Sequence, residues 1–300
     1  METDNLPYQA KEVANWAEAK AVFDSLLQDV WIFRGQGDAR YALSTSLERR
    51  ILDKVRGKYT PEQLLALEHT LTKRFMRGAG IYYADGLAPT NTLSWWAEMQ
   101  HYGMPTRLLD FTWSPYVASF FAVEDGTKEC DRAIWALRLD SGQANMTGHQ
   151  TRIVNFIVEE FGDKVEKQAI YSQDFWDDAA LVEAFIKAAQ AKQFRALIYV
   201  ATDRMNRRMI GQQGVFVMPS SIDVGFMECL AEPSNDAQAT SLGLIKIVLP
   251  SRSRWEVLSD LLRMNITRMS LFPGLEGFAR TLGDNIEHAL EQDKLEIQAS

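Results

Sequence analysis

Residues 100–122 of this 300-residue chain read QHYGMPTRLLDFTWSPYVASFFA and combine many reactive side chains with an apolar setting. A charged Arg or Asp in an apolar run is unfavourable unless it pairs with an opposite charge or contacts a ligand. The stretch therefore predicts either an ion pair between Arg107 and Asp110 or a binding site. Its polar members include His101, Thr106, Arg107, Asp110, Thr112 and Ser114.

The stretch connects two predicted helices through a loop at 104–110. The first helix is expected to end at His101, because Gly103 suits the left-handed position that follows a helix. The second is expected over residues 116–124, where a capping serine precedes a proline at the first helical position. Thr112 has no comparable local role. The capping residues are Asn91 or Thr92 for the first helix, and Ser114 with Pro115 for the second.

The rest of the chain mixes helical and strand patterns without a regular strand–helix–strand alternation. This mixture predicts an α+β fold with a mixed, largely antiparallel sheet and many flanking helices. Helices are expected at 11–28, from about 46, at 61–77, 177–193, 203–211, 253–264 and 275–292, and strands at 30–33, 132–139, 195–201, 214–218 and 242–249.

The domain organisation is expected to be simple, because no Pro-, Gly- or Ser-rich linker divides the sequence. We predict a single domain over residues 1–300, with an N-terminal helix within 1–29. Residues 141–176 carry weak signals, which indicates an insertion or a lid.

Composition narrows the class of protein. The net charge of −8 and the pI of about 5.2 disfavour nucleic acid and anionic lipid as partners. Two cysteines do not form a disulfide framework, and four scattered histidines do not predict a metal site. The acidic N-terminus is unlike a secretory signal, and no apolar run has the length of a membrane span. We expect a cytoplasmic protein that binds neither membrane nor metal.

Two further segments carry candidate binding groups. Arg34 ends an apolar strand, where its guanidinium could bind phosphate or carboxylate, or form a salt bridge at the sheet edge. Gly35 would then allow a tight turn or a close approach of the backbone to a ligand. Gln212 and Gln213 precede a strand, where their amides could bind a ribose or simply face a turn.

A carboxylate-based, metal-dependent nuclease is a weaker hypothesis. It would use Asp110, Glu124 and Glu129 with Lys128, but the spacing of these residues is generic. No phosphate-binding loop of the Walker type occurs, and Gly35 with Gly37 does not complete a dinucleotide-binding motif.

The motifs together resemble the FRG domain family, a bacterial and phage family. The resemblance extends from about residue 30 to 282, with Phe111 where the family usually has Trp. The family by itself implies no particular reaction. The segments that carry the resemblance are 33–35, 100–115, 120–122, 213–216, 265–266 and 270–277.

The order of these segments also resembles, more weakly, that of ADP-ribosyltransferases of the Arg–Ser–Glu type, and so implies an ADP-ribosyltransferase-like core. By this resemblance Arg34 would hold the NAD pyrophosphate, Thr112 or Ser114 would anchor the nicotinamide ribose, and Gln213 would occupy the catalytic position. The other implied substrate-binding residues are Gly35, His101, Arg107, Asp110, Ser114 and Gln212.

The resemblance implies an enzyme that uses NAD as substrate, for ADP-ribosyl transfer or NAD hydrolysis, without a metal. Its partners would be a nucleotide and a macromolecular acceptor, and its role that of a toxin or antiviral defence effector. Glutamine is neutral, so Gln213 would support only weak transfer, and Glu228 is a nearby carboxylate that could replace it. The alternative is a non-catalytic sensor that binds a nucleotide or nucleic acid.

Overall fold

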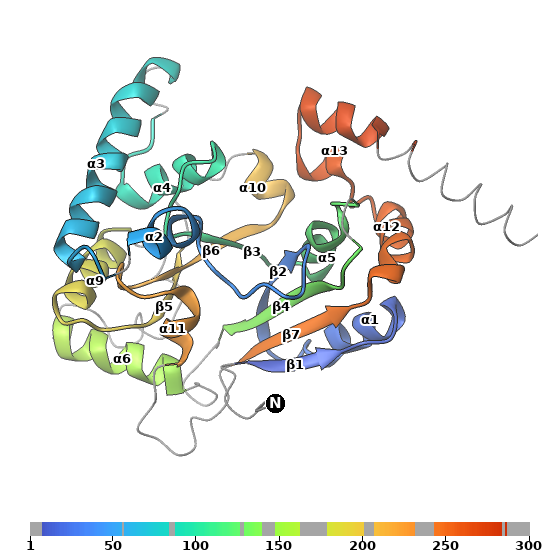
Figure 1. The fold of residues 1–300 in the computed structure, drawn as a ribbon, viewed down its shortest axis with the longest axis horizontal. Coiled ribbons are helices and arrows are strands. Elements are labelled where there is room, and N and C mark those ends of the chain that lie inside the picture. Colours follow the sequence, from blue (N-terminus) through green and yellow to red (C-terminus); the bar gives the residue numbers. More distant parts are fainter. Residues whose placement is uncertain are drawn as a thin grey trace, which may run out of the picture.

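The fold is built on one seven-stranded sheet with the order β1-β7-β4-β2-β3-β6-β5 (Figure 1). The computed structural model describes residues 8–55, 57–83, 88–126, 129–139, 148–162, 179–200, 207–231, 243–283 and 286. Among the described strands, β1 and β7 pair in parallel and the other neighbours are antiparallel. The predicted α+β class with a largely antiparallel sheet is confirmed. The strands are β1 (Gln9–Glu12), β2 (Val30–Gln36), β3 (Leu109–Thr112), β4 (Arg132–Leu139), β5 (Leu197–Val200), β6 (Gly214–Pro219) and β7 (Leu244–Leu249).

The helices begin where the capping residues predict. Thr60 and Gln63 form a reciprocal capping box, and the Asn91 side chain accepts a hydrogen bond from the Ser94 N–H. A π-helical turn (Glu48–Leu52) precedes α2, and short 3₁₀ turns lie at Gly80–Tyr82 and Ser251–Ser253. The α-helices are α1 (Trp16–Ser25), α2 (Asp53–Val55), α3 (Pro61–Ala79), α4 (Thr92–His101), α5 (Pro115–Val123), α6 (Gly148–Phe161), α9 (Ala179–Ala191), α10 (Arg207–Gly211), α11 (Phe226–Ala231), α12 (Arg254–Arg263) and α13 (Arg268–Leu271).

The observed secondary structure differs from the prediction in two segments, one near the start of the chain and one in the loop expected at 104–110. The helix expected at 11–28 begins only at Trp16, because Asn15 caps it, and β1 precedes it. All four side chains of β1 are exposed, so its pairing with β7 leaves no hydrophobic pattern in the sequence. The loop at 104–110 gives way to β3 at Leu109, with Leu109 and Phe111 buried on one face.

The region expected to be an insertion or lid contributes to the core. Helix α6 lies within 141–176, and its Ile153, Phe156 and Ile157 are buried. Residues 141–147 and 163–176 of that region lie outside the described part of the chain, as do 203–206 of the helix expected at 203–211. Residues 275–283 of the final predicted helix are helical, and most of its remainder is likewise outside the described part.

The sheet has buried side chains on both faces, because successive side chains of a strand face opposite sides. One face is covered by one continuous cluster and the other by two separate clusters. On one face a single cluster includes Trp135 of β4 and Val217 of β6. On the other face, Ile134 of β4 packs with α1, α5 and α12, which we call the α5 layer. Phe216 of β6 packs on that face with α4, α6 and α9, which we call the α4 layer. The two helical layers cover different halves of the sheet.

Two expectations from composition can be compared with the described residues. Cys130 and Cys229 are both free thiols. Of the helices in the described segments, none has the length and apolar character needed to cross a membrane.

Acid is expected to weaken the contact between α1 and α12. The buried Trp16 indole donates to Asp260 at 2.8 Å, and Lys20 Nζ lies 2.7 Å from the same carboxylate oxygen. Hydrogen bonds from Lys20 and Trp16 lower the pKa of Asp260. A lowered pKa stabilises the fold above the unfolded-state value, and this contribution is lost as pH falls through the folded-state value.

The Asp260→Asn variant tests this pH dependence. Because the pair is partly exposed, we expect it to contribute less than about 1 kcal/mol at neutral pH. Urea unfolding from pH 7 to pH 2.5 should therefore show a smaller loss of stability in the variant than in the wild type. Parallel curves for the two proteins would contradict the assignment.

Candidate functional site

The sheet opens between β2 and β3. Strand β2 pairs with β4 along its whole length, but with β3 only at Phe33 and Thr112. Beyond that pair the two strands no longer pair through their backbones. Instead the Arg34 side chain bridges them, because its Nη1 donates a hydrogen bond to the Asp110 carbonyl at 2.6 Å. The α4 and α5 layers also meet here, so the opening is a seam in both the sheet and its covering helices.

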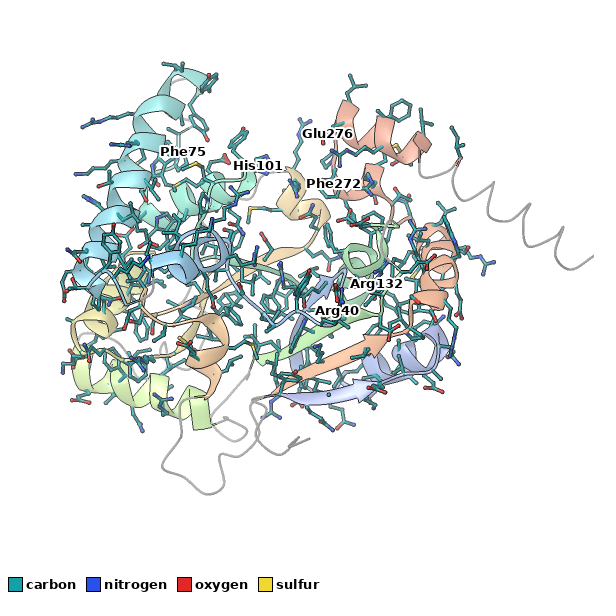
Figure 2. All side chains as sticks on the ribbon, viewed as in Figure 1. Arg40, Phe75, His101, Arg132, Phe272 and Glu276 are labelled. Atoms are coloured by element: carbon teal, nitrogen blue, oxygen red, sulfur yellow. The ribbon has the colours of Figure 1, made fainter. Side chains whose placement is uncertain are left out.

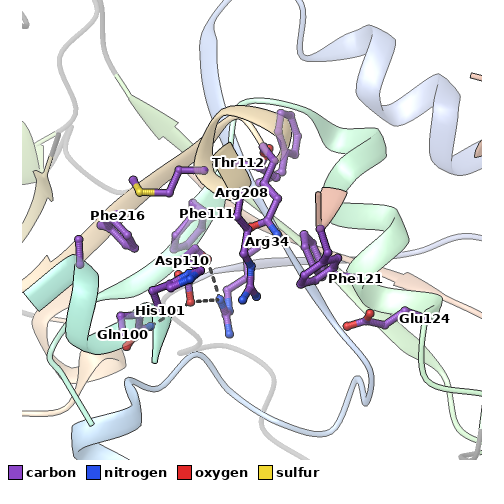
Figure 3. Close-up of a pocket in the computed structure, with 16 residues that line it drawn as sticks. Arg34, Gln100, His101, Asp110, Phe111, Thr112, Phe121, Glu124, Arg208 and Phe216 are labelled. Atoms are coloured by element: carbon purple, nitrogen blue, oxygen red, sulfur yellow. Dashed lines mark hydrogen bonds and ion pairs between the residues drawn. The ribbon is translucent and has the colours of Figure 1, made fainter. Parts of the chain in front are cut away.

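A pocket of about 340 Å³ occupies this seam (Figure 3). In Figure 2, His101 of α4 and Phe272 after α13 lie on either side of α10. Charged, polar and aromatic side chains all contribute to the walls of the pocket. The lining residues are Phe33, Arg34, Gly35, Ala97, Gln100, His101, Asp110, Phe111, Thr112, Phe121, Glu124, Arg208, Met209, Gln212, Phe216 and Phe272.

Arg34 lies in the middle of the pocket, on β2. Its side chain is 24% exposed and lies 3.8 Å from the Asp110 carboxylate. Burial lowers the pKa of the Arg34 guanidinium, the nearby Asp110 carboxylate opposes this change, and Arg49 adds to it. A guanidinium remains charged at neutral pH even so. Arg34 therefore presents a partly desolvated positive charge with Nε and Nη2 available for a ligand.

A hydrogen-bond network holds the Asp110 carboxylate from one side. Gln100 Nε2 donates to Asp110 Oδ2 at 2.9 Å and to the Leu108 carbonyl at 3.3 Å. The opposite end of the Gln100 amide accepts from Thr106 Oγ1 at 2.7 Å and from Ser46 Oγ at 3.3 Å. These contacts fix which end of the amide faces Asp110.

Thr112 and Gln212 line the pocket but are already bonded to the protein. The Thr112 hydroxyl donates to the Gln212 carbonyl at 2.6 Å and accepts from the Ser114 N–H at 3.1 Å. The Gln212 side chain donates to the Leu271 carbonyl at 3.1 Å. Thr112 therefore has the local role that the sequence did not reveal, joining β3 to the end of α10.

Three predicted site residues do not line this pocket. Ser114 accepts from the Val117 N–H as the N-cap of α5. Gln213 has a left-handed backbone with φ of 49°, and its carbonyl accepts from the Trp113 N–H. Arg107 is buried beside Glu68, so the predicted pairing with Asp110 is wrong.

The structure adds Arg208 and Phe272 to the site, which the sequence did not single out, and Glu124, which the sequence offered only to the nuclease hypothesis. Arg208 of α10 stacks on the Phe272 ring at 4.4 Å from its centroid. Its guanidinium has neither a hydrogen bond nor an ion pair within the described segments. Glu124, at the end of α5, pairs with Arg268 at 2.9 Å. Arg207 and Arg208 form a basic pair shortly before Gln212 in the sequence, but no sequence pattern places Phe272 beside them.

The nuclease hypothesis finds only part of its residues in the pocket. Asp110 and Glu124 line it, Glu129 does not, and Lys128 lies outside the described residues. The described segments contain no group of three His, Cys, Asp or Glu side chains suited to a metal ion. Glu228 also lies away from the lining and accepts from the Gly225 N–H.

Fold and site define an α+β protein with an arginine-bearing pocket at a seam in its sheet. The model of the FRG domain family matches residues 29–131, which include Arg34 and Asp110. Residues 29–131 therefore match the FRG domain family, as the motifs at 33–35, 100–115 and 120–122 predicted. No curated protein and no solved structure matches the chain.

Proposed function

We propose that the pocket binds NAD and that the chain is an ADP-ribosyltransferase-like enzyme that cleaves the bond between nicotinamide and ribose. The single observation that supports this most is the presence of Arg34 and Thr112 in one pocket, as the resemblance implies. The pocket volume also falls in the range of small-molecule sites. NAD depletion or modification of a macromolecular acceptor would suit a toxin or an antiviral effector.

The chemistry of the lining suits a dinucleotide. Arg34 and Arg208 offer two positive charges to a pyrophosphate, and guanidinium groups bind phosphate through paired hydrogen bonds. Phe121 and Phe272, both partly exposed, offer apolar surface to the nicotinamide and adenine rings. Arg208 is the more informative residue, because Arg34 also bonds the Asp110 carbonyl of the fold.

The Arg208→Ala variant tests nucleotide binding. Loss of one charge-assisted hydrogen bond should weaken NAD binding by about 10- to 100-fold. The control is Arg207→Ala, which removes the neighbouring, exposed arginine of α10 outside the pocket. Isothermal titration of NAD into the three proteins gives the affinities. Equal affinities for both variants, or no binding by the wild type, would exclude NAD binding at this pocket.

Nucleotide binding without turnover is the second candidate. It is favoured by the position of Gln213, which lies outside the pocket lining although the resemblance gives it the catalytic place. A wild-type protein that binds NAD but releases no nicotinamide, with or without protein acceptors, would support the sensor function over the enzyme.

A further inference from the structure

We infer that the carboxylate of Asp110, and not the neutral amide of Gln213, is the catalytic group of this pocket. The inference rests on the proposed cleavage of NAD and identifies the group that would stabilise the positive charge on the ribose. Asp110 and Glu124 are the carboxylates of the pocket lining in the described part of the chain. The choice between them follows from their contacts.

Glu124 is already neutralised by a protein cation. Its carboxylate lies 2.9 Å from Arg268 Nη1, and the side chains of the pair are only 27% and 13% exposed. A carboxylate bound in this way offers little negative charge to a ligand. Glu124 is therefore suited to holding the α5 layer to α13.

Asp110 is open to the pocket. Its side chain is 58% exposed, and the nearest cation, Arg34 Nη1, lies 3.8 Å away, beyond hydrogen-bond distance. Oδ2 accepts one hydrogen bond, from Gln100, and within the described segments Oδ1 accepts none. One carboxylate oxygen is thus held in place while the other remains free for a ligand.

The strand and the Gln100 network preorganise this carboxylate. Leu109 and Phe111, its neighbours on β3, are buried in the cluster on one face of the sheet, so Asp110 projects toward the opposite face and the seam. Gln100 is itself fixed by Thr106 and Ser46. A charge that is fixed before reaction stabilises a transition state without the cost of reorganisation.

The proposed cleavage of NAD is chemically balanced when water or an acceptor is the second substrate. The bond between ribose C1′ and the nicotinamide nitrogen breaks, and its electron pair leaves with nicotinamide, which becomes neutral. The ribose becomes oxocarbenium-like, and the negative charge of the Asp110 carboxylate stabilises this positive charge without forming a covalent bond. A water or acceptor oxygen or nitrogen then bonds C1′ and loses a proton; water gives ADP-ribose, nicotinamide and a proton.

The Asp110→Asn variant tests this assignment. The amide keeps the shape of the side chain but removes its charge, so kcat for nicotinamide release should fall by about 100-fold or more. The Kd for NAD and the thermal midpoint should stay near the wild-type values. The matched control is Glu129→Gln, which removes the charge of an exposed carboxylate outside the pocket lining and should keep kcat within about threefold. A variant that retains more than a third of the wild-type kcat would overturn the role of Asp110.

A second variant guards against a change in folding. Asp110→Ala should also lose turnover, and added formate should restore part of it by placing a carboxylate in the vacated space. No rescue in a folded variant that still binds NAD would count against the inference, as would an equal loss of kcat in Gln213→Ala. If the wild type binds NAD but releases no nicotinamide, the proposed enzymatic function itself fails.

Discussion

The Arg107→Met variant should lose about 3–5 kcal/mol of unfolding free energy, because it leaves a buried carboxylate without its partner. Arg107 is 2% exposed and contacts Glu68 of α3 through two hydrogen bonds of 2.7 and 2.9 Å. Its Nη1 also donates to the Ser220 carbonyl at 3.3 Å, just after β6, and its guanidinium lies over the Trp96 ring. One side chain thus connects α3, α4 and the end of β6.

The measurement is urea unfolding at pH 7, with the Glu68→Met and double variants as controls. Replacing both members of a buried ion pair by apolar residues of similar size is often close to neutral. We therefore expect the double variant to be clearly more stable than Arg107→Met alone. A loss below about 1 kcal/mol in the single variant, or no recovery in the double variant, would show that the pair is not the cause.

Arg107 also illustrates what a sequence can and cannot predict about this molecule. The unfavourable charge in an apolar run was evident, and a buried ion pair was one of two expected solutions. The actual partner, Glu68, lies 39 residues earlier on another helix. Local spacing favoured Asp110 instead, and no property of Glu68 distinguished it among the charged residues of α3.

The elements that were predicted well are those with local causes. Ser114 and Pro115 start α5 because a capping hydroxyl and a fixed proline φ act within one turn. Strand β4 was predicted over its observed bounds because its apolar content is continuous. Strand β1 was missed because backbone pairing with β7 forms it while its side chains remain exposed.

The pocket was predicted in part because some of its residues lie on elements that have local sequence signals. Arg34, Asp110 and Thr112 lie on strands whose register brings them together, so their motifs mark the seam. Arg208 and Phe272 reach the pocket only because α10 and α13 pack against each other, through contacts such as the bond from Gln212 to the Leu271 carbonyl. Tertiary packing of this kind has no local signal.

The Gly35→Ala variant should be destabilised by about 3 kcal/mol, because overpacking against backbone atoms cannot be relieved by a rotamer change. A Cβ at Gly35 would lie 1.8 Å from the Ala118 carbonyl oxygen and 2.5 Å from the Ala122 nitrogen, both in the backbone of α5. Gly35 therefore allows helix α5 to rest directly on β2, where the sequence suggested a turn or an approach to a ligand.

Gly37→Ala is the matched control, two residues further along the chain. Its Cβ would meet only the Ala122 carbonyl at 3.9 Å, an ordinary contact, so thermal and urea unfolding should show a change near zero. Equal effects at the two glycines would contradict the packing argument. Because α5 carries Phe121 and Glu124 into the pocket, any Gly35→Ala protein that still folds should also bind NAD more weakly than Gly37→Ala. The close contact of α5 with β2 thus fixes both the stability of the α5 layer and the position of one wall of the site.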